Sequence, residues 1–350
     1  MSRTAIGLGE RGHDVWIIAH PDGRFIQSAS QKLKIISAKL GMDYNPFMIF
    51  FIRNFIKKHG IDLMVTNIEK EVMVGGLAGR LAGIPNIRRV GREDDFNERL
   101  RVRWHQNLLV DRCIVPCNLI RDNALKRANW LDASSFTTIY NGRNPIVYPE
   151  NKILERRKEW GLSRSDSVIG VTTQLLKIKG LDMLIRVFAA ILKRYPDCYL
   201  VITGEGAEHQ NLQLLAKELM ISERVIFGGF SSDPLLSAAS YDIAVSNSQF
   251  EGFPNTVVEY LAAGRPVVTT DAGGVPEMVR HMCNGWLIPC GNEKKMYEGI
   301  LSLLENPDLR DKLSRGALKT IKEKFSEDMM MFNLEAFFKE TINRHKTIVR

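Results

Sequence analysis

Short apolar segments rich in β-branched residues alternate with segments of helical periodicity along the whole chain. The expected strands are residues 15–19, 63–66, 87–90, 113–115, 136–140, 168–172, 198–203, 225–227, 243–245, 267–269 and 286–288. The expected helices between them are residues 46–59, 72–82, 119–128, 180–195, 208–220 and 294–305. This alternation is typical of βαβ units, so it predicts an α/β fold with parallel sheets.

The length of 350 residues is enough for two domains. Turn-forming residues are concentrated at positions 141–149, where we place the boundary. The expected parts are a domain of residues 1–147, a second domain of residues 148–326 and a C-terminal segment, 327–350, whose helix crosses back to the first domain. In doubly wound sheets of this kind, ligands bind beyond the carboxyl ends of the strands.

The N-terminus departs from this pattern. Residues 4–11 read as a helix that ends at Gly12, and the first expected strand follows only at Val15. A doubly wound sheet normally opens with a strand, and each buried backbone group left unpaired by its loss costs about 1–3 kcal/mol. We therefore expect the first strand to be missing and the natural chain to begin upstream of Met1, which N-terminal sequencing of the native protein tests.

Two carboxylates, Glu251 and Glu259, bracket the run Glu-Gly-Phe-Pro-Asn-Thr-Val-Val-Glu. Pro254 suits the first position of a helix, which then ends at Gly264. The free N–H groups and dipole of such a helix start favour a phosphate. The two carboxylates can accept charge-assisted hydrogen bonds from the hydroxyls of sugar or ribose. The run therefore predicts a site for a sugar that carries phosphate.

This run resembles the E-x7-E signature of retaining glycosyltransferases, family 4 in particular, and the resemblance continues through residues 260–277. It implies a GT-B fold, in which two Rossmann-like doubly wound domains face a cleft. It also implies metal-independent transfer of a hexose from a nucleotide-diphosphate sugar with retention of anomeric configuration. The C-terminal domain would bind the donor, and the N-terminal domain would bind a saccharide or lipid-linked acceptor.

The loop at residues 172–180 follows an expected strand and resembles the family's Gly-Arg-Leu-x-x-x-Lys-Gly loop. Lys179 matches the lysine that neutralises the donor's diphosphate, a role that suits a mobile ammonium group. Gln174 stands in place of the family's arginine and removes one of two cations. Either Lys177 compensates, or the diphosphate is held less tightly, or activity is lost.

The resemblance assigns further donor contacts. Glu251 would hold the sugar hydroxyls and stabilise positive charge at the ring, and Glu259 would hold the ribose. The other implied donor-binding positions are Gly204, Glu205, Phe230, Gly252, Phe253, Asn255 and Thr256. Phe230 could read the nucleobase or belong to the core. No strong general base is visible, which suits a mechanism in which the leaving phosphate takes the acceptor's proton.

The sequence leaves two alternatives to glycosyl transfer. A non-catalytic sugar-nucleotide-binding or scaffold protein would explain Gln174 and the missing strand. A sugar-nucleotide epimerase could use the same fold, but the Glu251–Glu259 run favours transfer. We expect no metal and no cofactor. The sequence also lacks the motifs of P-loop proteins and zinc peptidases.

The formal charge of +8 is concentrated in the N-terminal half, where residues 1–150 contain 22 Lys and Arg against 15 Asp and Glu. Such a half favours an anionic membrane surface or an acidic substrate. No nucleic-acid-binding motif accompanies the charge, so nucleic acid is not an expected partner. The densest cluster, between Arg88 and Arg103, could be a self-paired loop or a contact for substrate or lipid.

Residues 45–59 carry four phenylalanines followed by two lysines. They could lie on a membrane as an amphipathic helix, but we favour a core helix that packs on the sheet. Neither His20 nor His105 is assigned a catalytic role. The chain begins without the apolar segment of a signal peptide, and its five cysteines include no Cys-x-x-Cys pair. The expected location is therefore the cytoplasm, with the inner face of the membrane as a peripheral site.

Overall fold

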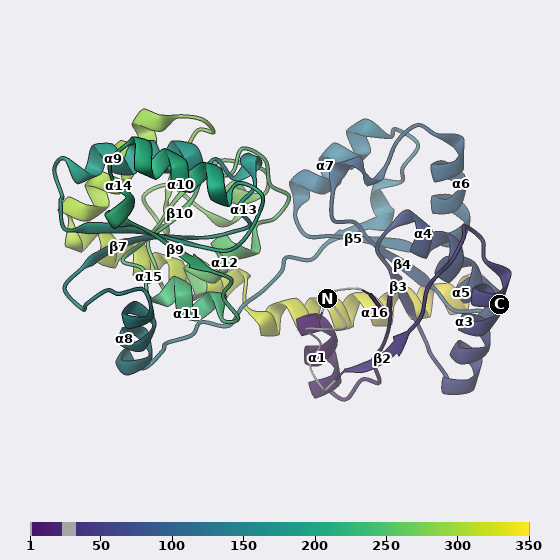
Figure 1. The fold of residues 1–350 in the computed structure, drawn as a ribbon. Helices are drawn as coiled ribbons and strands as arrows, with labels where there is room; N and C mark the ends of the chain where they lie inside the picture. Colours follow the sequence, from purple (N-terminus) through teal and green to yellow (C-terminus); the bar gives the residue numbers. More distant parts are fainter. Residues whose placement is uncertain (1, 23–32, 350) are drawn as a thin grey trace. The chain divides into compact units, whose positions relative to one another are not determined.

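The computed structural model of the chain describes residues 2–22 and 33–349. It divides into two compact α/β units (Figure 1). The N-terminal unit comprises Met1–Tyr140 together with Asp328–Arg350, and the C-terminal unit comprises Asn141–Glu327. The strands of both units pair in parallel, as the alternation of strands and helices predicts.

The C-terminal unit contains a six-stranded sheet in the order β12-β11-β10-β7-β8-β9. The strands are β7 (Ser167–Thr172), β8 (Cys198–Thr203), β9 (Val225–Gly229), β10 (Ile243–Ser246), β11 (Val267–Thr270) and β12 (Trp286–Ile288). The chain runs outward from β7 through β8 to β9 and then returns to place β10 on the other side of β7. The strand order therefore reverses between β7 and β10, which is where doubly wound sheets bind ligands.

Helices cover both faces of this sheet. Figure 1 shows α9, α10 and α14 over one face and α11, α12 and α15 over the other. The helices of this unit are α8 (Glu150–Glu159), α9 (Leu181–Leu192), α10 (His209–Glu218), α11 (Pro234–Ala239), α12 (Asn255–Ala262), α13 (Val275–Met278), α14 (Glu293–Glu305) and α15 (Pro307–Lys324).

The core of the C-terminal unit forms where apolar strand residues meet the apolar side of α9. Ile169 and Leu200 from the sheet and Leu184, Ile185 and Phe188 from α9 are all inaccessible to solvent. Each such side chain contributes about 1.5–3 kcal/mol relative to an exposed position. This core fixes the strands whose carboxyl ends carry the predicted site.

The N-terminal unit contains two separate parallel sheets, one of order β1-β2 and one of order β3-β4-β5-β6. The strands are β1 (Trp16–Ala19), β2 (Lys34–Ser37), β3 (Met64–Thr66), β4 (Asn86–Arg89), β5 (Arg112–Val115) and β6 (Phe136–Thr138). The helices are α1 (Ser2–Glu10), α3 (Pro46–His59), α4 (Glu69–Glu71), a π-helix (Val72–Gly76), α5 (Leu77–Ala82), α6 (Leu100–Leu109), α7 (Asn118–Arg127) and α16 (Glu327–Val349).

The two sheets share the same hydrophobic cores. Ile18 of β1 and Met64 of β3 both pack on the cluster formed by α3 and α5. Val15 and Val65 both pack on the second cluster, which includes Leu8 of α1. Within residues 2–22 and 33–349, α1 is the first element of the chain and no strand joins β1 to β3. The described residues of this unit therefore hold a divided sheet, and the absence of a first strand stays a prediction.

The last helix, α16, belongs to the N-terminal unit from Asp328 onward. Its buried Met330, Met331, Leu334 and Phe337 pack in one cluster with Ile87 of β4. Arg11 of the loop after α1 also binds this helix, through an ion pair of 3.3 Å with Asp328. None of the helices in the described part of the chain is both long and apolar enough to cross a membrane.

Candidate functional site

The loop after β7 presents Lys179 at the carboxyl edge of the C-terminal sheet. Residues Lys177–Lys179 form one 3-10 turn, which Gly180 ends with a left-handed backbone (φ 60°). A Cβ at position 180 would lie 2.6 Å from the backbone oxygen of Asn247, so only glycine fits there without displacement. This close approach ties the loop to the segment that follows β10.

Two hydrogen bonds join these loops. The side-chain amide of Asn247 donates to the carbonyl of Gly180 at 2.6 Å. The backbone N–H of Gln249 donates to the carbonyl of Ile178 at 2.9 Å. Because β7 and β10 flank the point where the strand order reverses, the two loops meet at the place where a ligand is expected.

Lys179 and Glu251 form an ion pair there, with Nζ 2.6 Å from Oε1. Ser248 Oγ donates to the same carboxylate oxygen at 2.5 Å. Both charged side chains are largely buried, with exposed fractions of 18% and 14%. The structure thus brings together the two residues that the sequence predicts to be catalytic, and it places them on adjacent loops 72 positions apart.

The turn at residues 271–274 packs against the backbone of Glu251 and Gly252. Gly274 donates its N–H to the carbonyl of Gly252 at 2.8 Å. Gly273 has φ 57°, and a Cβ there would lie only 1.8 Å from the carbonyl oxygen of Glu251. This turn belongs to the run that carries the family resemblance, and its glycines permit the close contact.

The second carboxylate, Glu259, lies inside α12 and is 5% exposed. Arg143 Nη2 donates to its Oε1 at 3.1 Å. The N–H of Arg143 donates to the carbonyl of Phe325 at 2.8 Å, which fixes the arginine's backbone. In the sequence, residues 141–149 are recognisable only as turn-forming residues, so this partner of Glu259 was not predicted. The single signal was a cation within that segment, 116 positions before Glu259.

Helix α12 begins one residue later than predicted, because Pro254 is the N-cap and Asn255 the first helical residue. Asn255 is exposed, Thr256 is half-buried and Phe253 is buried. Phe253 packs against Phe325 with ring centroids 6.1 Å apart, so its side chain supports the loop. Gly252, which precedes Phe253 in the chain, is half-buried.

Two buried tyrosines brace the strand ends beneath the site. Tyr241 is hydrogen-bonded to the hydroxyls of Thr172 and Thr203, at 2.8 Å each. Tyr260 of α12 accepts the N–H of Thr172 at 2.7 Å. Burial raises the pKa of Tyr241 to about 12 and also raises that of Tyr260, so both phenols stay neutral. They connect β7, β8 and α12, and their role is structural.

The remaining predicted donor residues lie at the ends of β7, β8 and β9. Gln174 and Glu205 are exposed, and Leu175 donates its N–H to the carbonyl of Glu205 at 2.9 Å. Gly204 has φ 137° and donates its N–H to the carbonyl of Gly229 at 2.7 Å. Phe230 is 74% exposed, which removes the interpretation that it belongs to the core.

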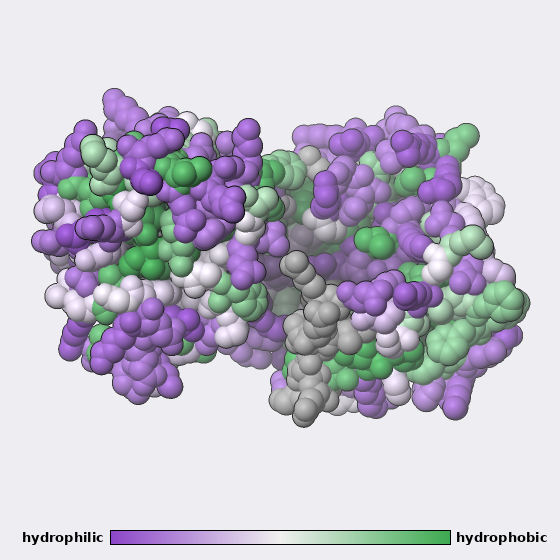
Figure 2. Space-filling model, viewed as in Figure 1, coloured by the Kyte–Doolittle hydropathy of each residue, from purple (hydrophilic) through white to green (hydrophobic). Residues whose placement is uncertain are grey.

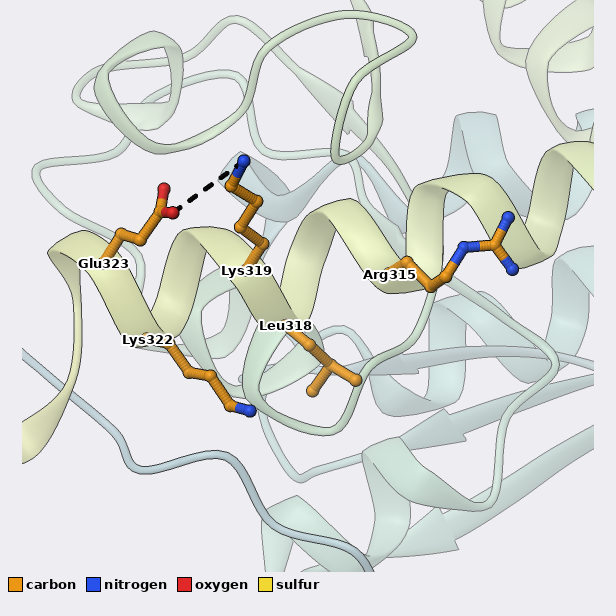
Figure 3. Close-up of a pocket in the computed structure, with 5 residues that line it drawn as sticks. All are labelled: Arg315, Leu318, Lys319, Lys322 and Glu323. Atoms are coloured by element: carbon orange, nitrogen blue, oxygen red, sulfur yellow. Dashed lines mark ion pairs between the residues drawn. The ribbon is translucent and has the colours of Figure 1, made fainter.

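The hollow drawn in Figure 3 lies elsewhere and contains none of these residues. It is lined by Arg315, Leu318, Lys319, Lys322 and Glu323, which all come from α15. Lys319 and Glu323 form an exposed ion pair of 3.8 Å. Side chains from one exposed helix do not converge on a ligand, so we do not assign a site there. No cluster of metal-ligating side chains occurs among residues 2–22 and 33–349.

In the N-terminal unit, the arginine cluster is partly self-paired, since Arg92 and Asp94 form an ion pair of 2.7 Å. Arg88 is 1% exposed, lies 3.4 Å from Glu69 and stacks 4.6 Å from the ring of Phe96. His105 is fully buried and is hydrogen-bonded to Glu69 and to the Tyr44 hydroxyl. Arg99, Arg101 and Arg103 remain exposed.

Comparison with known protein families identifies the family of this chain. The profile described as "Glycosyl transferases group 1" matches residues 152–320, which carry Lys179, Glu251 and Glu259. The profile described as "Glycosyltransferase Family 4" matches residues 1–146. The chain belongs to glycosyltransferase family 4. The two matches divide the chain close to the boundary between the two units.

An uncharacterized glycosyltransferase of Haemophilus influenzae is 34% identical over 314 residues, which are 87% of this chain and 86% of the relative. Alignments with other curated relatives span about half of their length. For the N-acetyl-alpha-D-glucosaminyl L-malate synthase of Bacillus anthracis, 26% identity covers 60% of this chain and 55% of that enzyme.

Solved structures share the fold of this glycosyltransferase. A glycosyltransferase from Rickettsia africae has a TM-score of 0.86 at 19% identity, over 97% of this chain and 93% of that one. Anabaena Alr3699/HepE in complex with UDP has a TM-score of 0.83 at 20% identity, over 97% of this chain and 96% of that one. The predicted GT-B fold is therefore confirmed, and at these identities the likeness concerns the fold alone.

Proposed function

We propose that this glycosyltransferase moves a hexose from a nucleotide-diphosphate sugar to a saccharide or lipid-linked acceptor, with retention of anomeric configuration and without a metal ion. The observation that carries the proposal is the Lys179–Glu251 pair of 2.6 Å at the point where the strand order reverses. An ammonium group and a carboxylate on adjacent loops supply opposite charges to the two ends of a sugar diphosphate.

The chemistry balances without a further co-reactant. The bond between the sugar's anomeric carbon and the diphosphate oxygen breaks, and the acceptor oxygen forms a new bond on the same face. The acceptor's proton passes to the departing phosphate. Lys179 stabilises the negative charge that develops on that phosphate, and Glu251 orients the sugar hydroxyls and stabilises positive charge at the ring.

The donor's nucleotide half would lie along the edge formed by β8, β9 and α12. Glu259 would hold the ribose hydroxyls, and a carboxylate has enough acceptor positions to do so while Arg143 binds Oε1. Backbone groups of Gly204, Glu205 and Phe230, with the side chain of Gln174, would meet the base and phosphates. Anabaena Alr3699/HepE, which shares this fold, was solved in complex with UDP and with UDP-glucose, so UDP-sugars are the first donors to test.

The acceptor is proposed to belong to cell-envelope polysaccharide synthesis in the cytoplasm. Relatives include a lipopolysaccharide core glycosyltransferase of Rhizobium meliloti at 30% identity. Another is a Campylobacter jejuni enzyme whose name gives a diphospho-undecaprenol acceptor, at 34% identity. Both alignments cover under half of this chain.

Donor turnover tests the proposal. The purified chain is incubated with UDP-, GDP- and ADP-hexoses in the presence of EDTA. Released diphosphate is quantified, and NMR determines the anomeric configuration of the sugar product before it mutarotates. We expect release from one nucleotide class, with the donor's configuration retained. An inverted product, or turnover that only added metal ions restore, would contradict the proposed mechanism.

A second function is favoured by one observation. Gln174 replaces the family's arginine and is exposed at the loop that carries Lys179, so one cation for the diphosphate is lost. A protein that binds sugar nucleotides without transferring them would tolerate this loss. In that case the diphosphate would bind, but no donor would be consumed with any acceptor.

A further inference from the structure

Helix α3 exposes an apolar side. The prediction of a core helix holds for one side only, where the buried residues recur at helical spacing and are Ile49, Ile52 and Ile56. The phenylalanines lie on the other sides: Phe47 is 87% exposed, Phe50 is 56% and Phe51 is 45%. Exposing three large aromatic rings on one helix forgoes several kcal/mol of burial, so a surface of this kind indicates a binding face.

A second helix of the same unit repeats this pattern. In α6, Leu100 is 80% exposed and Trp104 is 64% exposed. They are four positions apart and therefore lie on one side of the helix. The opposite side is buried and comprises Val102, His105, Gln106 and Leu109.

The loop before α3 joins these two helices. The Tyr44 hydroxyl is hydrogen-bonded to His105 of α6, and Asp43 lies 3.6 Å from Arg101 of the same helix. Met42 and Tyr44 in this loop are 82% and 41% exposed. We call these exposed apolar side chains of the loop and the two helices, taken together, the aromatic face: Met42, Tyr44, Phe47, Phe50, Leu100 and Trp104. Figure 2 shows hydrophobic residues gathered over α3 on the visible side of this unit.

The aromatic face is held in place by buried polar groups. His105 binds Tyr44 through one ring nitrogen and Glu69 through the other. Glu69 in turn lies 3.4 Å from the buried guanidinium of Arg88. The loop is thereby fixed to the core of the unit, so the apolar side chains are exposed without a conformational change.

Basic residues accompany the aromatic face. Lys57 and Lys58 end α3, and Arg99, Arg101 and Arg103 begin or precede α6; all five are exposed. The exposed acidic side chains on the same two segments are Asp43, which faces Arg101, and Glu98. The cations outnumber the anions, and long cationic side chains can reach phosphates while their stems cover apolar surface.

We propose that the aromatic face binds the surface of an anionic phospholipid bilayer. Exposed Phe, Trp and Leu with adjacent Lys and Arg is the pattern that enters the boundary between headgroups and acyl chains. The excess of cations favours anionic lipid headgroups as the partner. A neutral membrane surface, or a protein surface with few acidic residues, would not match this charge. This binding goes beyond the proposed transfer and would bring the N-terminal unit to membrane-bound acceptors.

Vesicle flotation tests the proposal on the full chain. The protein is mixed with vesicles of phosphatidylcholine alone or of phosphatidylcholine with phosphatidylglycerol. We expect flotation with the anionic vesicles, reduced at least tenfold by Phe47→Glu and by Trp104→Glu. Leu214→Glu is the matched control, because Leu214 is 58% exposed on α10 of the C-terminal unit, and it should float normally. Replacing Lys57 and Lys58 by Gln should weaken binding about fivefold per charge.

Two outcomes would overturn the inference. One is equal flotation of the Phe47→Glu variant and the natural sequence. The other is no flotation together with a dimer in sedimentation that Phe47→Glu dissociates, which would assign the face to a second copy of the chain. UDP binding is measured on the same samples, because a natural sequence that binds UDP but does not float with anionic vesicles refutes this inference alone. Loss of UDP binding with intact flotation refutes only the proposed function.

Discussion

Lys179 and Glu251 are joined by a hydrogen-bonded ion pair of 2.6 Å between loops that follow adjacent strands of the C-terminal sheet. Ser248 binds the same carboxylate oxygen, so three residues define one polar position. An arriving diphosphate would compete with Glu251 for the ammonium group. Release of the carboxylate toward the sugar would then accompany donor binding.

The two glutamates should respond differently to truncation. Glu259→Ala should weaken nucleotide binding about tenfold or more, because Glu259 is proposed to hold the ribose. Glu251→Ala should reduce turnover by a larger factor than it reduces nucleotide affinity, because its contacts strengthen in the transition state. Calorimetric titration with the nucleotide and steady-state kinetics measure both quantities. Equal losses of nucleotide affinity in the two variants would contradict the assigned roles.

Restoring the missing cation should strengthen donor binding. Gln174→Arg should raise the affinity for the nucleoside diphosphate about tenfold, because a charge-assisted hydrogen bond contributes about 1.5–3 kcal/mol. Gln174→Met, which keeps the length of the side chain without the charge, is the control. If the arginine variant binds no better than the methionine variant, then position 174 does not face the diphosphate.

Arg143 and Glu259 should be energetically coupled. Both side chains are largely buried, so removing either leaves a desolvated charge without this partner. Each single change to Ala should lower the free energy of unfolding by about 2–4 kcal/mol. The double variant should lose less than the sum by about 1–3 kcal/mol in urea denaturation. Additivity within about 0.5 kcal/mol would show that the pair does not interact.

Gly273 should tolerate no side chain. Gly273→Ala combines a left-handed backbone with a clash against the carbonyl of Glu251, and we expect a cost of about 2–5 kcal/mol. Gly291 also has positive φ (74°) but no heavy atom within 4 Å, so Gly291→Ala should cost only about 1–2 kcal/mol. Thermal denaturation compares the stability of the two variants. Similar losses of stability would mean that the turn makes no close contact with the carbonyl of Glu251.

Much of the fold could be predicted from the sequence because short apolar segments rich in β-branched residues alternate with segments of helical periodicity. The bounds of β8 and β12 match the prediction residue for residue. Strand β2 was missed because Lys34–Ser37 is short and only half-buried, so its apolar signal is weak. Helix α6 was missed because its apolar residues lie on both sides and are separated by arginines.

The candidate site could likewise be predicted only in part. Lys179 and Glu251 could be predicted because each lies in a local run that specifies a strand, a turn and a helix. The Arg143–Glu259 pair could not, because it joins residues 116 positions apart and depends on where a linker passes. The exposure of Phe47 was also unpredictable, because Phe and Ile are both apolar and helical spacing alone does not say which side meets the sheet.

Thermal melting of the purified chain with UDP, GDP and ADP shows whether the C-terminal unit holds a donor site. We expect one diphosphate to stabilise the protein, by about 2.7 kcal/mol at one hundred times its dissociation constant. We also expect Glu259→Ala and Lys179→Gln to weaken this effect. If none of the three diphosphates shifts the melting temperature of a cooperatively folded chain, the C-terminal unit has no working donor site and the proposed function is wrong.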